Sequence, residues 1–275
     1  MPGVQEKDLS DWGAFECELL ELRQEFGRSP SELLFRGQND SKYLLTTTLE
    51  RAGCERMRLK DYYQLVASQI RPAVETFTGV IWDVPQYSVE LETSFYDREL
   101  FSLRKFPSVE LYRYMVYLRH HGFPSPLLDW SYSPYVAAFF AFRDQTAEPN
   151  KRSIYVYCEA PKGFKGGAVG EPAMRPIGPY VRSHRRHFRQ QSNYTICCAF
   201  GSDLGWYFYP HDPVFGSRDK QDFLWKFNLP STERTKVLRL LNDYNLNAFS
   251  LFDSEEALLE TMWLRERDLK VPDSL

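Results

Sequence analysis

The sequence predicts an α+β fold, in which a helical amino-terminal half packs on a mixed or antiparallel sheet. Helical spacing of apolar residues dominates the first half of the chain, whereas segments rich in β-branched and aromatic residues gather in the second half. No regular alternation of strand and helix occurs, as a parallel sheet would require. With 275 residues, of which 43% are hydrophobic and 26% charged, the chain can bury such a core, which argues against the disordered and fibrous classes.

The first expected element is a helix over residues 8–26. Its apolar residues recur at intervals of three or four, and these are Trp12, Phe15, Leu19, Leu22 and Phe26. Gly27 and Pro30 should end this helix.

A strand and two helical regions follow in the first half. The apolar run at 33–35 is too short for a helix and predicts a strand that ends at Gly37. Helical spacing returns over 55–79 and again over 93–120, where Pro107 interrupts it.

The second half opens with a buried helix and then turns to strands. Ser133 and Pro134 fit the cap and first position of a helix that is apolar almost all round. Residues 154–158 alternate as a strand does, and residues 160–180 are rich in Gly and Pro, which predicts a long loop. One or two strands are expected over 180–200.

The last elements are a strand at 224–229, a helix from Ser231 and a helix over 254–267. Because no composition break marks a linker, we expect one domain over residues 1–275. Its parts would be the amino-terminal helix in 8–30, core motifs in 31–200, and a carboxy-terminal strand and helices in 201–275.

Charge and cysteine content exclude several classes of protein. The chain has 34 basic and 37 acidic side chains, a net charge of −3, so any nucleic-acid binding must depend on a local patch. Five irregularly spaced cysteines without a Cys-x-x-Cys pair argue against a disulfide framework and a zinc cluster. We therefore expect no metal and a reducing, cytoplasmic location.

Membrane and common enzyme motifs are missing from the sequence. No apolar run reaches the ~18 residues that span a bilayer, and residues 1–11 lack the apolar core of a signal peptide. No membrane partner is expected. Walker, Rossmann, His-Glu-x-x-His and Gly-x-Ser-x-Gly patterns do not occur, which disfavours the NTPases, dehydrogenases, zincins and hydrolases that carry them.

Arg36 is the first candidate for chemistry. It stands at the end of the strand at 33–35, before Gly37 and Gln38. A planar guanidinium suits phosphate or carboxylate, and the glycine would let a ligand approach the backbone. The alternative is a surface arginine beside a turn, without a function.

A second group of candidates lies between residues 120 and 142. Asp129 and Trp130 stand in an apolar stretch, where a carboxylate would need a partner. Ser131 and Ser133 precede the buried helix, whose free N–H groups favour an anion. His121 could act as a base, with His120 expected on the other face. The alternatives are that Asp129 caps the helix, Trp130 is core and His121 is structural.

The stretch 172–202 is basic and contains no acid. Its arginines are Arg175, Arg182, Arg185, Arg186 and Arg189. Such a block is either a solvated or ion-paired face, or an anion site for pyrophosphate or nucleic acid. If residues 180–189 form a strand, Arg182, His184 and Arg186 share one face. Tyr194 and the aromatic cluster at 205–210 could stack on bases, or belong to the core.

Two of these segments resemble the FRG domain family. Phe35-Arg36-Gly37 matches the family's name-giving signature, and the run from His120 to Ser131, followed by Val136 to Ala141, is similar to its His-His-Gly-x-Pro-Thr-Arg-Leu-Leu-Asp-Trp-Thr motif and helix. The sequence departs at Arg119, where the family usually has Gln, at Ser125-Pro126 for Thr-Arg, and at Ser131 for Thr. The family implies bacterial, phage, toxin-like or defence settings.

A looser resemblance connects the chain with the ADP-ribosyltransferase fold. That fold carries an Arg or His on its first core strand, a Ser-rich segment before a helix, and a late strand with Glu or Gln. The resemblance implies that NAD is the substrate, and that a protein or nucleic acid could be the target. Since the late position here reads Gln190 or Gln191, with no acid between residues 172 and 202, Asp129 would have to supply the negative charge.

The resulting hypothesis is an NAD-dependent ADP-ribosyltransferase or NAD glycohydrolase. The expected catalytic residues are Arg36, Asp129, Ser131, Gln191 and His121. The expected cofactor-binding residues are Arg36, Gly37, Gln38, Trp130, Ser133, Arg186 and Gln190. Two alternatives stay open: a silent module that binds a nucleotide or nucleic acid through Arg175 to Arg189, and a buried Arg36–Asp129 pair that only stabilises the fold.

Overall fold

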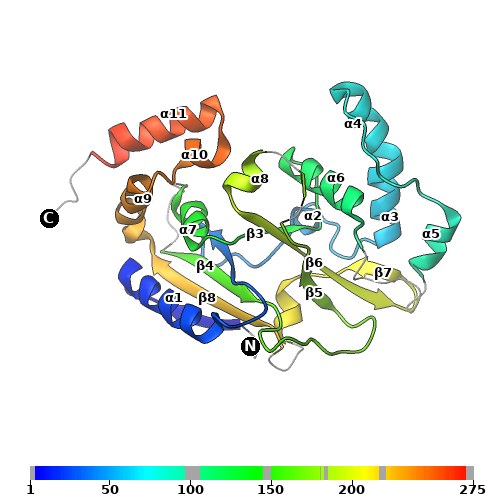
Figure 1. Ribbon diagram of the computed structural model, residues 1–275, viewed down its shortest axis with the longest axis horizontal. Coiled ribbons are helices and arrows are strands. Elements are labelled where there is room, and N and C mark those ends of the chain that lie inside the picture. Colours follow the sequence, from blue (N-terminus) through cyan, green and yellow to red (C-terminus); the bar gives the residue numbers. More distant parts are fainter. Residues whose placement is uncertain are drawn as a thin grey trace.

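The computed structural model describes residues 4–96, 106–144, 150–179, 181–182, 185–216 and 221–270. Within these residues, eight strands form one sheet in the order β1-β8-β4-β2-β3-β6-β5, with β7 paired to β6 (Figure 1). The strands are β1 (Val4–Asp8), β2 (Leu34–Gln38), β3 (Leu128–Ser131), β4 (Lys151–Cys158), β5 (Ala173–Pro176), β6 (Ser192–Gly201), β7 (Gly205–Phe208) and β8 (Phe223–Pro230). The β1–β8 pair is parallel and the other pairs are antiparallel, so the predicted α+β class with a mixed sheet is confirmed.

The sheet opens between its two central strands. β2 pairs with β4 along its whole length, and β3 does the same with β6. In contrast, β2 and β3 share a single paired position, Phe35 with Ser131. Beyond that pair the two strands separate, which leaves space between the halves of the sheet.

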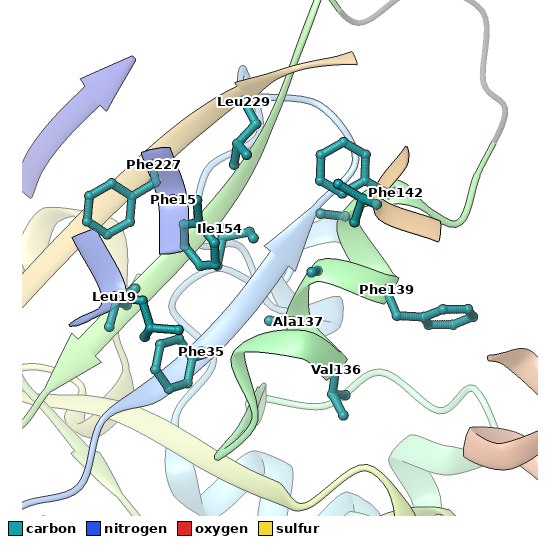
Figure 2. Close-up of a cluster of buried hydrophobic side chains, with 14 of the residues drawn as sticks. Phe15, Leu19, Phe35, Val136, Ala137, Phe139, Phe142, Ile154, Phe227 and Leu229 are labelled. Carbon is teal, nitrogen blue, oxygen red and sulfur yellow. The ribbon is translucent and has the colours of Figure 1, made fainter. Parts of the chain in front are cut away.

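Three helices cover the half of the sheet that contains β2, β4 and β8. They are α1 (Trp12–Phe26), α7 (Pro134–Phe142) and α9 (Arg234–Asp243). Figure 2 shows part of their common core, in which Phe15 and Leu19 of α1 share one cluster with Phe35 of β2. The apolar positions of the predicted first helix are all buried, although the helix begins at Trp12, after the Asp11 cap.

Gly37 is the closest approach between helix α7 and the sheet. A Cβ atom at this position would lie 1.9 Å from the carbonyl oxygen of Ala137 and 2.6 Å from the backbone nitrogen of Ala141. Only glycine leaves room for the helix backbone there. The approach that the sequence suggested for a ligand is therefore made by the helix, although Gly37 also borders the cavity described below.

The other half of the sheet packs on helices from the first part of the chain. These are α2 (Thr48–Arg51), α3 (Leu59–Gln64), the π-helical η1 (Leu65–Ile70), α4 (Arg71–Thr78), α5 (Val89–Ser94) and α6 (Val109–His120). Tyr62 and Tyr114 form a second core there with Tyr194 of β6 and Trp206 of β7. Trp206 is thus a core residue, and part of the expected 93–120 region lies outside the described residues.

The carboxy-terminal helices lie beyond the sheet, with α11 at the periphery (Figure 1). The remaining elements are α8 (Arg185–Arg189), the 3-10 turns η3 (Asp212–Gly216) and η4 (Ser231–Glu233), α10 (Ala248–Phe252), α11 (Glu255–Trp263) and the π-helical η5 (Leu264–Asp268). No helix in the described part of the chain is long and apolar enough to cross a membrane.

Two local predictions were wrong, and one strand was not predicted. The segment at 180–189 contains helix α8, because Arg186 and Arg189 turn toward carbonyl groups of the neighbouring helix α10. Tyr180 and His184 lie outside the described residues. The predicted loop at 160–180 contains strand β5, which pairs with β6, and the polar start of the chain forms β1, which pairs with β8. Long-range pairing decides both strands, and neither has a clear local pattern.

Candidate functional site

The opening between β2 and β3 contains a cavity of about 450 Å³. Strands β2, β3 and β6 form its floor, and helices α6, α7, α8 and α10 supply the walls. The polar and charged lining residues are Arg36, Gln38, Asn39, Thr48, Arg119, His120, Asp129, Ser131, Asp144, Arg186, Gln190, Ser192 and Tyr194. The aromatic residues Phe35, Trp130, Phe140 and Phe252 also line the cavity.

Arg36 crosses the gap where the two central strands separate. Its Nη1 donates a hydrogen bond of 2.8 Å to the backbone oxygen of Asp129 and lies 3.9 Å from Oδ2 of the same residue. Burial lowers the pKa of Arg36 to about 10, although the nearby Asp129 carboxylate opposes this shift. The guanidinium still carries its charge at neutral pH.

Arg119 holds the Asp129 carboxylate from helix α6. Its Nε and Nη2 donate to the two carboxylate oxygens, and its Nη1 donates to Thr48 Oγ1 at 3.1 Å. Dense packing raises the pKa of Asp129, but Arg119 and then Arg36 outweigh it, so the pKa lies below its ordinary value. The carboxylate remains 44% exposed because it faces the cavity.

Arg119 was not among the predicted site residues. The sequence marked it only as a departure from a family pattern. A half-buried carboxylate such as Asp129 needs a cationic partner, and Arg119 fills this role. From the sequence alone, many other arginines in the chain could have been that partner. The proximity of the end of α6 to β3 selects Arg119.

The charge of the lining favours an anionic ligand. Arg36, Arg119 and Arg186 border the cavity, against the two carboxylates of Asp129 and Asp144. At neutral pH this leaves one positive charge in excess, not counting His120. Asp144 lies near the rim, where Asn39 donates to it at 3.1 Å.

His120 borders the cavity, whereas His121 does not. The Nε2 atom of His120 lies 3.1 Å from the Tyr194 hydroxyl, within hydrogen-bond distance. His121 is exposed and rests against the ring of Tyr117, with ring centroids 4.4 Å apart. The structure thus places the two histidines opposite to the expectation, because His120 ends helix α6 on the side that faces Asp129 and Tyr194.

The serines of the predicted site stabilise the entry to helix α7. Ser131 Oγ donates to the backbone oxygen of Gln190 at 2.7 Å and accepts from the backbone nitrogen of Ser133 at 3.0 Å. Ser133 Oγ accepts from Val136 N at 3.3 Å and does not border the cavity. Ser131 borders the cavity, but its hydroxyl is used in hydrogen bonds that stabilise the turn before helix α7.

Trp130 and Gln38 have partners away from the cavity centre. The Trp130 indole is 3% exposed and donates from Nε1 to Thr195 Oγ1 at 2.9 Å. Trp130 borders the cavity, but most of its ring is buried in a core cluster with Tyr157 on the other face of the sheet. Gln38 Nε2 donates to the backbone oxygen of Leu44 at 3.3 Å.

Of the two adjacent glutamines, Gln190 reaches the cavity. Its side-chain Nε2 donates to the Leu251 carbonyl at 3.4 Å, and its backbone oxygen accepts from Ser131. Gln191 is exposed, adopts a left-handed φ of 47°, and does not border the cavity. Arg36, Ser131 and Gln190 therefore meet in one cavity, and Gln191 lies outside it.

The basic segment docks the carboxy-terminal helices. Arg186 Nε donates to the Phe252 carbonyl at 3.2 Å, and Arg189 Nη1 to the Ser250 carbonyl at 3.1 Å. Arg189 and Arg185 also approach the Asp253 carboxylate, at 3.0 and 3.7 Å. Several of the charges suggested for nucleic acid are thus used within the chain, and nucleic-acid binding by this segment stays a prediction.

No cluster of three or more metal-ligating side chains occurs in the described part of the chain. The five cysteines are free thiols, and three of them, Cys158, Cys197 and Cys198, are buried. Burial raises the pKa of the Cys158 thiol to about 11 and that of Cys198 to about 12. Both thiols are therefore protonated at neutral pH, as is typical of cysteines buried in a core.

Comparison with protein families gives a match for this central part of the molecule. A model of the FRG domain matches residues 31–150. The chain carries an FRG domain. No curated protein and no solved structure matches the chain.

The FRG domain supplies only part of the cavity. Its matched residues include Arg36, Arg119 and Asp129, together with helix α7, which Gly37 of the Phe-Arg-Gly signature admits to the sheet. The other walls come from β6, α8 and α10, which follow the matched residues and carry Tyr194, Gln190 and Phe252.

Proposed function

We propose that the cavity binds NAD and that the chain is an ADP-ribosyltransferase-like enzyme. The observation that carries the proposal is the Arg36–Asp129–Arg119 cluster, which faces a cavity between two separating strands. The volume of about 450 Å³ lies within the roughly 300–1,000 Å³ typical of small-molecule sites.

The excess positive charge supports binding of a pyrophosphate. Arg36 uses Nη1 for the Asp129 backbone oxygen, and its planar fork is suited to a second, charged acceptor. Arg186, at the α8 wall, is a second cation that borders the cavity. Two separated guanidinium groups suit a ligand with two linked phosphates better than one with a single carboxylate.

The order of the elements supports the same proposal. Arg36 lies on β2, Ser131 on β3 directly before helix α7, and Gln190 directly before β6. These three strands are neighbours in the sheet, and the three residues border one cavity. This is the order that the resemblance to ADP-ribosyltransferases implies for the residues around NAD.

The proposed reaction transfers ADP-ribose from NAD to an acceptor. The bond between the ribose C1′ and nicotinamide breaks, and its electron pair leaves with nicotinamide. An oxygen or nitrogen of the acceptor, which is water in the glycohydrolase case, then bonds to C1′ and loses its proton. Among the described histidines, His120 borders the cavity, and we assign it to receive this proton.

Asp129 takes the electrostatic role in this proposal. The positive charge that develops on the ribose needs an anion nearby. Gln190 is neutral and bonded to the Leu251 carbonyl, whereas the ionised Asp129 carboxylate faces the cavity. The ion pair with Arg119 weakens the electrostatic effect of the Asp129 carboxylate. A ligand that interacts with Arg119 would therefore strengthen the stabilisation that Asp129 gives to the positively charged ribose.

Calorimetry with NAD and measurement of released nicotinamide test the proposal. The wild type should bind NAD and release nicotinamide, and Arg36→Lys should bind at least about tenfold more weakly, because one ammonium cannot replace the planar fork. Asp129→Asn should retain binding and lose nicotinamide release. His121→Gln is the matched control, since this histidine lies outside the cavity, and it should behave as the wild type.

The outcome that contradicts the proposal is a folded wild-type protein that neither binds NAD nor releases nicotinamide, alone or with a cell lysate as the source of acceptor. An unfolded Arg36→Lys protein would instead favour a purely structural role for the Arg36–Asp129 contact.

A toxic or defensive role is part of the proposal, because unregulated consumption of NAD harms a bacterial cell. Expression of the wild type in bacteria should slow growth and lower cellular NAD, and Asp129→Asn at equal protein level should not. Equal growth with both proteins would contradict this role.

A further inference from the structure

Asp144 is the second carboxylate that borders the cavity, and the proposed reaction assigns it no role. It follows the end of helix α7 and is exposed at the rim. Asn39 Nδ2 donates to its Oδ2 at 3.1 Å, and among the described residues no other donor reaches this carboxylate. Asn39 therefore orients the group, and Oδ1 is left to accept a hydrogen bond from a ligand.

Asp129 and Asp144 lie at opposite ends of the cavity. Helix α7 packs along strand β2 (Figure 2). Strand β3, which leads into this helix, pairs with Phe35, whereas Asp144 at the other end contacts Asn39. Arg36, which contacts Asp129, and Asn39 are separated by roughly 10 Å at about 3.3 Å per residue of extended chain.

Two separated carboxylates suit the two riboses of a dinucleotide. NAD carries one ribose on each side of its pyrophosphate. Asp129 takes the nicotinamide ribose in the proposed reaction, so the ribose that bears adenine would lie toward Asp144. In other dinucleotide sites, an acidic side chain accepts a hydrogen bond from the 2′-hydroxyl of this second ribose.

We propose that Asp144 binds the adenosine ribose and makes the chain select NAD over NADP. This inference rests on the proposed function and adds the specificity of the site to it. NADP carries a phosphate on the 2′-oxygen, which removes the hydroxyl donor. A phosphate monoester also carries a charge of about −1.5 to −2 at neutral pH, and the Asp144 carboxylate would repel it.

The arginines that could offset this repulsion are engaged by other groups. Arg143 and Arg152 interact electrostatically with Asp144. Arg143 forms two hydrogen bonds with Glu260, and Arg152 is 3% exposed and donates to two backbone carbonyl groups. Neither borders the cavity. Arg186 does border it, and the proposed function assigns this residue to the pyrophosphate.

Calorimetry with ADP-ribose and with its 2′-phosphorylated form tests the proposal on the full chain. Both ligands contain the adenosine ribose and lack the bond to nicotinamide, so the proposed reaction does not consume them. The wild type should bind ADP-ribose at least about tenfold more tightly than the 2′-phosphorylated form. Asp144→Asn should weaken the binding of ADP-ribose and reduce this preference to less than about threefold, because an amide does not repel the phosphate.

A charge reversal and a control sharpen the test. Asp144→Arg should prefer the 2′-phosphorylated form, because a guanidinium pairs with phosphate. Asp243→Asn is the matched control: Asp243 is also an exposed aspartate at the end of a helix, α9, and it does not border the cavity. Its replacement should leave the preference unchanged. Since Asp144 is exposed, circular dichroism should show the native fold for both of its variants.

Equal binding of the two forms by the wild type, or the wild-type preference in either Asp144 variant, overturns the inference. If the same wild type binds NAD and releases nicotinamide, the proposed function stands without it. A wild type that binds neither form also overturns the inference, and one that in addition fails to bind NAD overturns the proposed function as well.

Discussion

The charge at the floor of the cavity comes from three side chains, those of Arg36, Arg119 and Asp129. Two guanidinium groups share one carboxylate, so the cluster retains a positive charge before any ligand binds. The short contacts of Arg119 hold the Asp129 side chain in place, while the 3.9 Å separation leaves Arg36 less strongly paired. Arg36 is therefore the residue through which an anionic ligand would interact with the cluster.

Replacement of Asp129 by asparagine should destabilise the protein. Without the carboxylate, Arg36 and Arg119 would face each other as two poorly solvated cations. Removal of one partner from a fully buried pair costs ~3–5 kcal/mol, and we expect about 2 kcal/mol here because Asp129 is 44% exposed and partly screened by water. Urea unfolding measures the loss.

The double variant Asp129→Asn with Arg119→Gln is the control for this effect. It should recover part of the stability, because it removes one of the two uncompensated charges. A double variant as unstable as the sum of the single variants would contradict the coupling of these residues.

The pH dependence of stability should reflect Asp129. Its pKa is lowered in the folded state, so its contribution is present above the unfolded carboxyl pKa of about 4 and is lost as the pH falls through the folded value. The difference in unfolding free energy between wild type and Asp129→Asn should be constant from neutral pH to about pH 5 and shrink at lower pH. A difference that grows on acidification would contradict this assignment.

At the scale of elements, the contact between helix α7 and strand β2 is the most demanding in the fold. The Ala137 and Ala141 backbone lies against Gly37, and Ala138 adds a third small side chain to this buried helix. Ser133 caps the helix at its start, and Arg152 donates to the Ala141 and Asp144 carbonyls near its end. The helix is thus fixed at both ends and in the middle.

Gly37→Ala should disrupt this contact. A Cβ atom 1.9 Å from the Ala137 oxygen cannot be accommodated without a shift of the helix, so we expect a loss of more than ~3 kcal/mol, at the upper end for overpacked sites. The matched control is Gly166→Ala, since nothing lies within 4 Å of its Cβ position. Urea unfolding midpoints of the two variants test this prediction. Equal midpoints would contradict it and show that helix α7 can shift to accommodate the added methyl group.

At the scale of the whole molecule, the described part of the FRG-matched residues 31–150 contains two of the eight strands that the structure describes, β2 and β3. Their partners β4 and β6 come from residues after the match. Arg186 and Arg189 then hold helix α10 against the cavity wall, and Arg143 forms a two-bond ion pair with Glu260 of α11, at 2.5 and 2.6 Å. The site is therefore a property of the longer chain.

A fragment of residues 31–150 should not fold by itself. Its two strands share one paired position, and their other edges would be exposed without β4 and β6. Circular dichroism and amide dispersion in proton NMR should show a disordered or molten chain, compared with the 275-residue protein. Cooperative unfolding of the fragment would contradict this prediction.

Local patterns in the chain were sufficient for the elements with regular spacing or clear caps. The first helix, the strand that carries Arg36, the Ser133-capped helix and the strands at 154–158 and 224–229 follow from such patterns, as does the α+β class. The FRG signatures, and with them Arg36 and Asp129, were also evident, because glycine, proline and buried charge are restrictive at short range.

Long-range packing decided the rest. It selected Arg119 as the partner of Asp129, His120 over His121, and Gln190 over Gln191, since which of two adjacent side chains faces a cavity depends on what packs against the other face. Long-range packing also buries most of the Trp130 ring in a core cluster. These outcomes depend on contacts with residues that are distant in the sequence. The residue types of the site could therefore be predicted from the sequence, whereas only the folded chain shows which individual residues belong to it.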